Sequence, residues 1–302
     1  MRIYFVCIEY VTHSIGLTAT IATSYADPFT VARQIASLDK ISKGRAGWNA
    51  ITSNPGGLAI YSRSHLRKAD LYPMKKEFLE IVEGLWDSYE DDAFIRDKKS
   101  GVFFYDPGKM HPLHYTGNYF SVEGPLNISR SRQGRPVVFQ AGTSMEFMDI
   151  AAQHAEIIMA PGDDFGYLKA FTAELKRKVQ NQGRSPNDLL MMPSHNPIVG
   201  ETEKEALDKL REIESWIPKG YRVPKPQWMG SAEQVAEKIE HWYREGVMDI
   251  LLIRQDHPAG FEDFIRLVVP ILQDKGIFRK EYEDDTLRGN LGLPYPENRY
   301  TK

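Results

Sequence analysis

Residues 134–160 read GRPVVFQAGTSMEFMDIAAQHAEIIMA, and this stretch decides the fold. An apolar run at 137–139 ends in Gln140, Ala141 and Gly142, and Thr143-Ser144 then opens an amphipathic segment. A second apolar run follows at 157–159. This order predicts a strand, a glycine turn, a helix capped by a hydroxyl group and a second strand.

The turn formed by Gly142, Thr143 and Ser144 is the first candidate site. It places free backbone N–H groups and two hydroxyl groups at the start of a helix, where an anion binds favourably. A phosphate-bearing cofactor is the ligand that we expect there. An ordinary βα turn with a serine cap explains this segment equally well, so both interpretations stay open.

Strand-like and helical patterns alternate along the rest of the chain, which predicts an α/β fold with a parallel sheet flanked by helices. Six strands are expected, and a closed (β/α)8 barrel needs eight. The polar segment 87–135 reads as an excursion between barrel units, and the tail 276–302 should wrap the surface. The predicted strands are 17–23, 45–52, 136–141, 156–160, 189–199 (interrupted by Pro193) and 248–254; the predicted helices are 28–41, 74–85, 144–153, 166–180, 202–216, 231–245 and 261–275.

Composition excludes several classes of function. The 302 residues carry a net charge of −3 with mixed signs, which argues against nucleic acid as a partner. Cys7 is the single cysteine, so the chain forms no internal disulfide, and a reducing, cytoplasmic location is expected. Glu9 interrupts the apolar N-terminus, which therefore does not read as a signal peptide, and no run reaches the length of a membrane span. The eight histidines lack metal-ligand spacing, and nucleophile-elbow, dinucleotide and P-loop motifs are absent.

Polar residues in two of the predicted strands are further candidates for the site. Thr18 and Thr20 alternate onto one face of their strand, and polar side chains at the carboxyl ends of barrel strands point into the usual active-site mouth. Asn49 follows Trp48, and its amide offers the donors and the acceptor that suit the edge of a flavin ring. Threonines also favour strands for their own sake, and Asn49 is equally explained as a structural amide with satisfied hydrogen bonds.

Three long segments together resemble one known family. They are GLTATIATSYADPFTVARQIASLDKISKGRAGWNAITS (16–53), YTGNYFSVEGPLNISRSRQGRPVVFQAGTS (115–144) and FIRLVVPILQDKGIFRKEYEDDTLRGNLGLP (264–294). The chain resembles the bacterial-luciferase-like flavin monooxygenases, in the branch of nitrilotriacetate monooxygenase component A, dibenzothiophene-sulfone monooxygenase and long-chain alkane monooxygenase. The resemblance implies that residues 1–302 form a single luciferase-like barrel domain.

The resemblance also implies an activity and a cofactor. The family binds reduced FMN, which a separate NAD(P)H:flavin reductase supplies transiently, and uses O2 to oxygenate a small organic substrate. Carried over by position, Thr20 and Asn49 contact the flavin ring, while Tyr72, Gly142, Thr143 and Ser144 hold its phosphate. Lys68 stands where the family has a phosphate-site histidine. No catalytic residue and no metal ligand is assigned.

Two departures from the family pattern shape the remaining expectations. The family's chains begin well before the segment that matches residues 1–17, so we expect the first two barrel strands to be missing. Residues 217–230 stand in place of a long lid insertion. An incomplete barrel with open sheet edges should associate into a homo-oligomer. Two functions therefore stay open: an FMN-dependent monooxygenase, and a catalytically impaired flavin-binding or non-catalytic remnant that acts through a protein partner.

Overall fold

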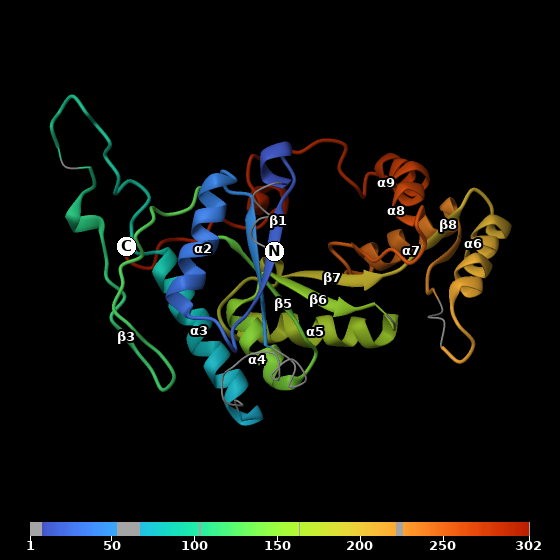
Figure 1. Cartoon of the computed structure of the whole chain (residues 1–302), viewed down its shortest axis with the longest axis horizontal. Helices are drawn as coiled ribbons and strands as arrows, with labels where there is room; N and C mark the ends of the chain where they lie inside the picture. The colour runs from blue at the N-terminus through green and yellow to red at the C-terminus, as the bar shows by residue number, and fades with distance from the viewer. Residues whose placement is uncertain (1–7, 53–66, 103, 163, 222–225, 302) are drawn as a thin grey trace. The chain divides into compact units, whose positions relative to one another are not determined.

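The computed structural model describes residues 8–52, 67–102, 104–162, 164–221 and 226–301 (Figure 1). Contacts along the chain divide it into two compact units. The first contains Met1–Glu156 and Tyr282–Lys302, and the second contains Ile157–Glu281. The first unit is therefore discontinuous in sequence, and it includes residues 282–302 of the tail.

A parallel sheet of β1, β2 and β5 forms the centre of the first unit. The strands are β1 (Leu17–Ala22), β2 (Ala46–Ile51) and β5 (Val137–Ala141). Thr20 pairs with Asn49, and Asn49 pairs with Phe139, so these three residues form one row across the sheet. Neighbouring residues in such a row point to the same face of a sheet.

Helices α2 (Pro28–Ile41) and α3 (Leu71–Trp86) cover one face of this sheet. Asp27 caps α2 by accepting a hydrogen bond of 2.8 Å from the Thr30 N–H group. The fully buried Trp48 faces this helical layer, with its ring centroid 5.9 Å from that of Phe78. Because side chains alternate along a strand, Asn49 and its row face away from the helices.

Residues 87–135 form an excursion of short elements that reaches away from the sheet, at the left of Figure 1. It contains η3 (Pro107–Lys109) and a hairpin of β3 (Tyr115–Thr116) and β4 (Ser121–Val122), which the sequence did not predict. The hairpin turn is attached to α3 because the Glu77 carboxylate accepts hydrogen bonds of 2.8–3.3 Å from three backbone N–H groups, those of Asn118, Tyr119 and Phe120.

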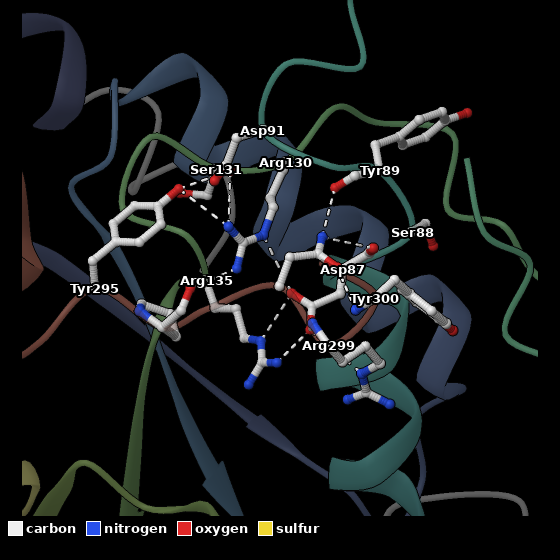
Figure 2. Close-up of polar contacts among 12 residues, drawn as sticks. Asp87, Ser88, Tyr89, Asp91, Arg130, Ser131, Arg135, Tyr295, Arg299 and Tyr300 are labelled. Atoms are coloured by element: carbon white, nitrogen blue, oxygen red, sulfur yellow. Dashed lines mark hydrogen bonds and ion pairs between the residues drawn. The ribbon is translucent and has the colours of Figure 1, made fainter. Parts of the chain in front are cut away.

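The tail is anchored to the first unit through buried charges (Figure 2). Asp87 is fully buried after the last turn of α3, and guanidinium groups of Arg130, Arg135 and Arg299 converge on its carboxylate. Asn298 donates hydrogen bonds of 3.1 and 2.9 Å to the carbonyl groups of Asp87 and Tyr89. The buried Asn298 and the guanidinium group of Arg299 thus hold the tail, which the sequence pattern expects to wrap the surface.

A second anchor lies at α10 (Leu287–Asn290). Arg288 is 3% exposed, and its guanidinium donates hydrogen bonds of 2.5 and 3.0 Å to the two carboxylate oxygens of Glu156. The Glu156 carboxylate also accepts a hydrogen bond of 2.9 Å from the Val138 N–H group on β5. A bidentate pair of this kind ties the tail to β5, the strand that leads into the Gly142–Ser144 turn.

The second unit has its own parallel strands, in the order β6 (Ile157–Pro161), β7 (Leu190–His195) and β10 (Leu252–Ile253). A small parallel pair, β8 (Ile198–Gly200) and β9 (Met229–Ser231), accompanies them. The remaining elements are η4 (Pro186–Asp188), α5 (Phe165–Asn181), α6 (Glu203–Trp216), α7 (Ala232–Arg244), α8 (Gly260–Asp263), the π-helical turn Phe264–Val268 and α9 (Val269–Asp274).

Three elements of this unit differ from the sequence expectation. Pro193 does not interrupt β7, where it pairs with Ala160, because β10 reaches only Ser194 and His195 and requires no donor from the proline. The strand expected at 248–254 is reduced to Leu252–Ile253. Before it, the N–H groups of Asp249 and Ile250 both donate to the Met191 carbonyl, and the Asp249 carboxylate accepts from the Met191 N–H group at 2.8 Å. The helix expected at 261–275 contains a π turn before Pro270, which cannot donate to the preceding turn.

Candidate functional site

The Gly142–Ser144 turn leads from β5 into α4 (Met145–His154). Ser144 is extended (φ −74°, ψ 162°), and its Oγ accepts a hydrogen bond of 3.2 Å from the Phe147 N–H group, as an N-cap does. Gly142 has φ +152°, and a Cβ placed there would lie 2.7 Å from the Phe147 ring. Only glycine fits this position, so the turn's backbone lies directly against the first turn of α4.

Tyr72 joins this turn from α3. Its hydroxyl oxygen lies 3.1 Å from Ser144 Oγ, while Glu83 and His154 are joined at 3.0 Å farther along the same two helices. The two helices therefore run side by side in the same direction, and both N-termini lie at one end. Two helix N-termini together offer partial positive charge and free N–H groups, which favour a phosphate group. The partly buried Asp70 at the start of α3 is held by Arg67, whose hydrogen bond lowers the pKa of that carboxyl.

Thr20 and Asn49 lie side by side on the neighbouring strands β1 and β2. Asn49 Nδ2 donates a hydrogen bond of 3.2 Å to Thr20 Oγ1. Asn49 is 7% exposed, and its Oδ1 has no hydrogen-bond partner among the residues that the structure describes. A buried acceptor without a donor is unusual in proteins and indicates a place for a ligand N–H group.

The two groups of residues are separated by a length that suits FMN. Asn49 pairs with Phe139, which precedes Gly142 by three residues of β5. At about 3.3 Å per residue, the turn lies about 10 Å from the Thr20–Asn49 row. This distance is comparable to the five-carbon chain that joins a flavin ring to its phosphate. The orphaned Asn49 acceptor and the glycine-lined turn therefore fit the two ends of this cofactor.

The sequence patterns did not identify two buried polar residues, Lys75 and Gln140, that lie behind the turn. Lys75 is 1% exposed, and its Nζ lies 5.4 Å from the centroid of the Phe147 ring. Burial lowers the pKa of Lys75 to about 7. Gln140 is fully buried, and neither of its amide atoms has a partner within the described ranges. A signal was present for both, since Lys75 lies four residues from Leu71 and from Leu79 on the apolar face of α3, and Gln140 ends an apolar strand.

Thr143 and Lys68 are the other two residues predicted for the phosphate end of the site. Thr143 is half-buried in the turn, and the side chain of Lys68 lies outside the described part of the chain. Within the residues described, no group of three or more histidine, cysteine, aspartate or glutamate side chains gathers as a metal site would require. In the same residues, every helix is too short or too polar to cross a membrane.

Comparison with known proteins decides the family. The family model described as luciferase-like monooxygenase matches residues 7–249. This chain belongs to that family. N-acetyl-S-(2-succino)cysteine monooxygenase of Bacillus subtilis (strain 168) is 38% identical, over 97% of this chain and 80% of the relative. Nitrilotriacetate monooxygenase component A of Aminobacter aminovorans is 33% identical, over 97% and 78% of the two chains.

A solved structure supports the same assignment. Riboflavin lyase, determined with modified FMN and its substrate riboflavin, superposes with a TM-score of 0.89 at 27% identity, over 97% of this chain and 78% of that one. The predicted family and branch are thus confirmed, as is an α/β fold similar to luciferase-like TIM barrels. The luciferase-like chain is a flavin-dependent monooxygenase. That its barrel lacks two strands, and that its residues form one domain, stay predictions.

Proposed function

We propose that this luciferase-like protein is the oxygenating component of a two-component monooxygenase. It binds reduced FMN and uses O2 to oxygenate a small organic substrate. The observation that carries the proposal is the Tyr72–Ser144 contact of 3.1 Å, which joins two helix N-termini beside the glycine-lined turn. Bound reduced flavin would supply the reaction with O2, and the protein would bind and orient it.

The turn is proposed to hold the phosphate. Ser144 and Tyr72 supply hydroxyl groups, and Gly142 lets the backbone of the turn approach without a side chain in the way. Thr143 supplies a further hydroxyl group at the same turn. Each charge-assisted hydrogen bond to the phosphate should contribute about 1.5–3 kcal/mol to binding.

The Thr20–Asn49 pair is proposed to bind the flavin ring. Asn49 Oδ1 is a buried acceptor that a ring N–H group would satisfy, and the bond from Nδ2 to Thr20 Oγ1 holds the amide in that orientation. Because Trp48 is packed among the helices on the opposite face, Asn49 stands on a strand with little freedom to move. A rigid amide selects one orientation of the ring.

A flavin reductase is the proposed partner. The relative from Aminobacter aminovorans is named as component A of a monooxygenase, which supports a separate source of reduced flavin for this chain as well. We further propose a transient encounter with that reductase, a homo-oligomeric state and a cytoplasmic location. The comparisons do not favour the non-catalytic remnant, since monooxygenases match nearly the whole chain.

Anaerobic titration tests the cofactor. Purified protein is titrated with reduced FMN and with reduced riboflavin, which has the same ring and no phosphate. We expect FMN to bind at least tenfold more tightly than riboflavin. Equal affinities would reject the phosphate site, and failure to bind either flavin would reject the proposed function.

Isotope incorporation tests the reaction. The protein is combined with a flavin reductase, NADH, FMN, a candidate sulfur compound or amino-carboxylate, and 18O2. One labelled oxygen atom should enter the product while the other leaves as water. The reductase without the protein is the control, and product formation in that control would remove the evidence for this chain's activity.

A further inference from the structure

We propose that Lys75 is a ligand of the flavin phosphate, placed behind the Gly142–Ser144 turn as a buried cation. The inference rests on the proposed function and adds one residue to its phosphate site. The group that Lys75 would recognise is a phosphate monoester rather than the flavin ring.

The position of Lys75 on α3 directs it to this turn. Lys75 follows Tyr72 by three residues, so both side chains lie on the same face of the helix. The Tyr72 hydroxyl contacts Ser144, and Lys75 Nζ lies over the ring of Phe147. Phe147 in turn donates its N–H group to Ser144 and fills the space beside Gly142. The ammonium group therefore lies at the first turn of α4, behind the proposed phosphate position.

Among the residues that the structure describes, Lys75 has no anionic partner of the kind that a buried ammonium group requires. The residue is 1% exposed, and in the same described ranges its Nζ makes no hydrogen bond or ion pair and lies over the face of the Phe147 ring, 5.4 Å from the centroid. Burial of an unpaired charge is strongly unfavourable, so such groups in proteins are generally paired or neutral. A phosphate bound at the turn would be the missing counter-charge. Gln140, whose buried amide also lacks a partner in the described part of the chain, makes the region behind the turn polar as well.

The protonation of Lys75 should therefore follow the ligand. Its pKa is lowered to about 7, and burial is the only cause. No titratable group on α3 or α4 contributes to that pKa shift, and β5 carries no titratable group. The titratable groups in question are Tyr72, Lys76, Glu77, Glu80 and Glu83 on α3, and Glu146, Asp149 and His154 on α4. A phosphate dianion nearby would favour the charged form. Binding at pH 8 should therefore draw a proton onto Lys75.

A charge-removing pair of variants tests the inference. Lys75→Met removes the buried ammonium group, and Lys76→Met makes the same change at the next, exposed residue. Reduced FMN and reduced riboflavin are titrated anaerobically into each protein by calorimetry at pH 8, in two buffers with different ionisation enthalpies. We expect Lys75→Met to weaken FMN binding by about tenfold to a hundredfold and to leave riboflavin unchanged. The wild type and Lys76→Met should take up close to one proton with FMN, and Lys75→Met should take up clearly less.

The possible outcomes distinguish an error about Lys75 from an error about the proposed function. If the wild type prefers FMN to riboflavin and Lys75→Met binds FMN equally well, the inference is wrong and the proposed function stands. If Lys75→Met weakens both flavins alike, Lys75 has a structural role and the inference is also wrong. If the wild type binds neither flavin, the proposed function fails, and the role of Lys75 fails with it.

Discussion

The hydroxyl oxygen of Tyr72 lies 3.1 Å from Ser144 Oγ, so the second residue of α3 contacts the N-cap of α4. The two residues are 72 positions apart in sequence. Their contact brings two helix N-termini to one place, and the proposed binding of phosphate depends on that arrangement.

Tyr72→Phe and Ser144→Ala should separate ligand binding from helix capping. Both variants remove the hydroxyl contact, so we expect each to weaken FMN binding by about tenfold or more and to leave riboflavin binding unchanged. Ser144→Ala also removes the N-cap, which should lower the free energy of unfolding by about 1 kcal/mol. Flavin titration and urea denaturation measure the two effects. FMN affinity equal to that of the wild type in both variants would contradict the phosphate site.

Gly142→Ala should distort the turn. The substitution combines an unfavourable backbone conformation with a contact of 2.7 Å against the Phe147 ring. We expect the free energy of unfolding to fall by about 2–4 kcal/mol, together with FMN affinity. Gly183→Ala is the matched control, because Gly183 also has a positive φ but has open space around its Cβ position. Similar destabilisation of the two variants in urea would show that the Phe147 contact is unimportant.

Asn49→Ala should affect the ring instead of the phosphate. Removing the orphaned acceptor should weaken FMN and riboflavin by the same factor, about tenfold, because the two ligands share the ring. Thr18→Ala provides a control on the neighbouring strand, at an exposed position. A loss confined to FMN would place Asn49 near the phosphate and contradict the proposed orientation.

Lys75→Met should stabilise the protein in a pH-dependent way. Burial lowers the folded-state pKa of Lys75 to about 7, below the ordinary value of 10.5. Between these two values the unfolded chain binds one proton more, so wild-type stability rises with pH, by about 1.4 kcal/mol per unit. Below pH 7 both states are protonated and the full penalty of about 4–5 kcal/mol remains.

Urea denaturation of the ligand-free protein at several pH values tests this direction of the pH dependence. We expect the variant to gain several kcal/mol over the wild type at pH 6.5 and much less at pH 9.5. Lys76→Met should show no such trend. A gain that stays constant with pH would mean that Lys75 titrates normally and contributes only through packing.

Asp87→Asn should loosen the tail. It removes the buried charge on which Arg130, Arg135 and Arg299 converge, and breaking a buried ion pair in this way typically costs about 3–5 kcal/mol. Protease treatment should then cut near residues 282–302 before the rest of the chain. Asp92→Asn, at an exposed ion pair with Lys109, is the control and should change stability by less than about 1 kcal/mol. Equal resistance of both variants to protease would contradict the anchoring role.

Local signals in the sequence were sufficient for most of the fold. The helix at 28–41 was predicted with its observed bounds because Asp27 and Pro28 mark its start and its apolar positions repeat with helical spacing. The strand around Val138 was predicted from its apolar run, Val137 to Phe139, and the strand around Trp48 was predicted although Asn49 interrupts its apolar residues. The β3–β4 hairpin was missed because each of its strands has two residues, too few to show alternation.

The sequence predicted the candidate site only where its residues are adjacent in one segment. Gly142 to Ser144 adjoin one another in sequence, so the turn could be identified directly. The contact between Lys75 and Phe147 depends on how α3 packs on α4, and charge patterning alone does not distinguish Lys75 from its exposed neighbour Lys76. The pair formed by Arg288 and Glu156 spans 132 residues and has no local signature.

The anchoring of residues 282–302 to the first unit determines when that unit can be completed during synthesis. Residues 157–281 emerge from the ribosome before Arg288 and Arg299 exist to neutralise Glu156 and Asp87. Nascent chains therefore carry both carboxylates without all of their partners until residues 282–302 have been synthesised. The first unit should acquire its final stability only once those residues have left the ribosome and packed against it, and until then its surfaces remain incompletely packed.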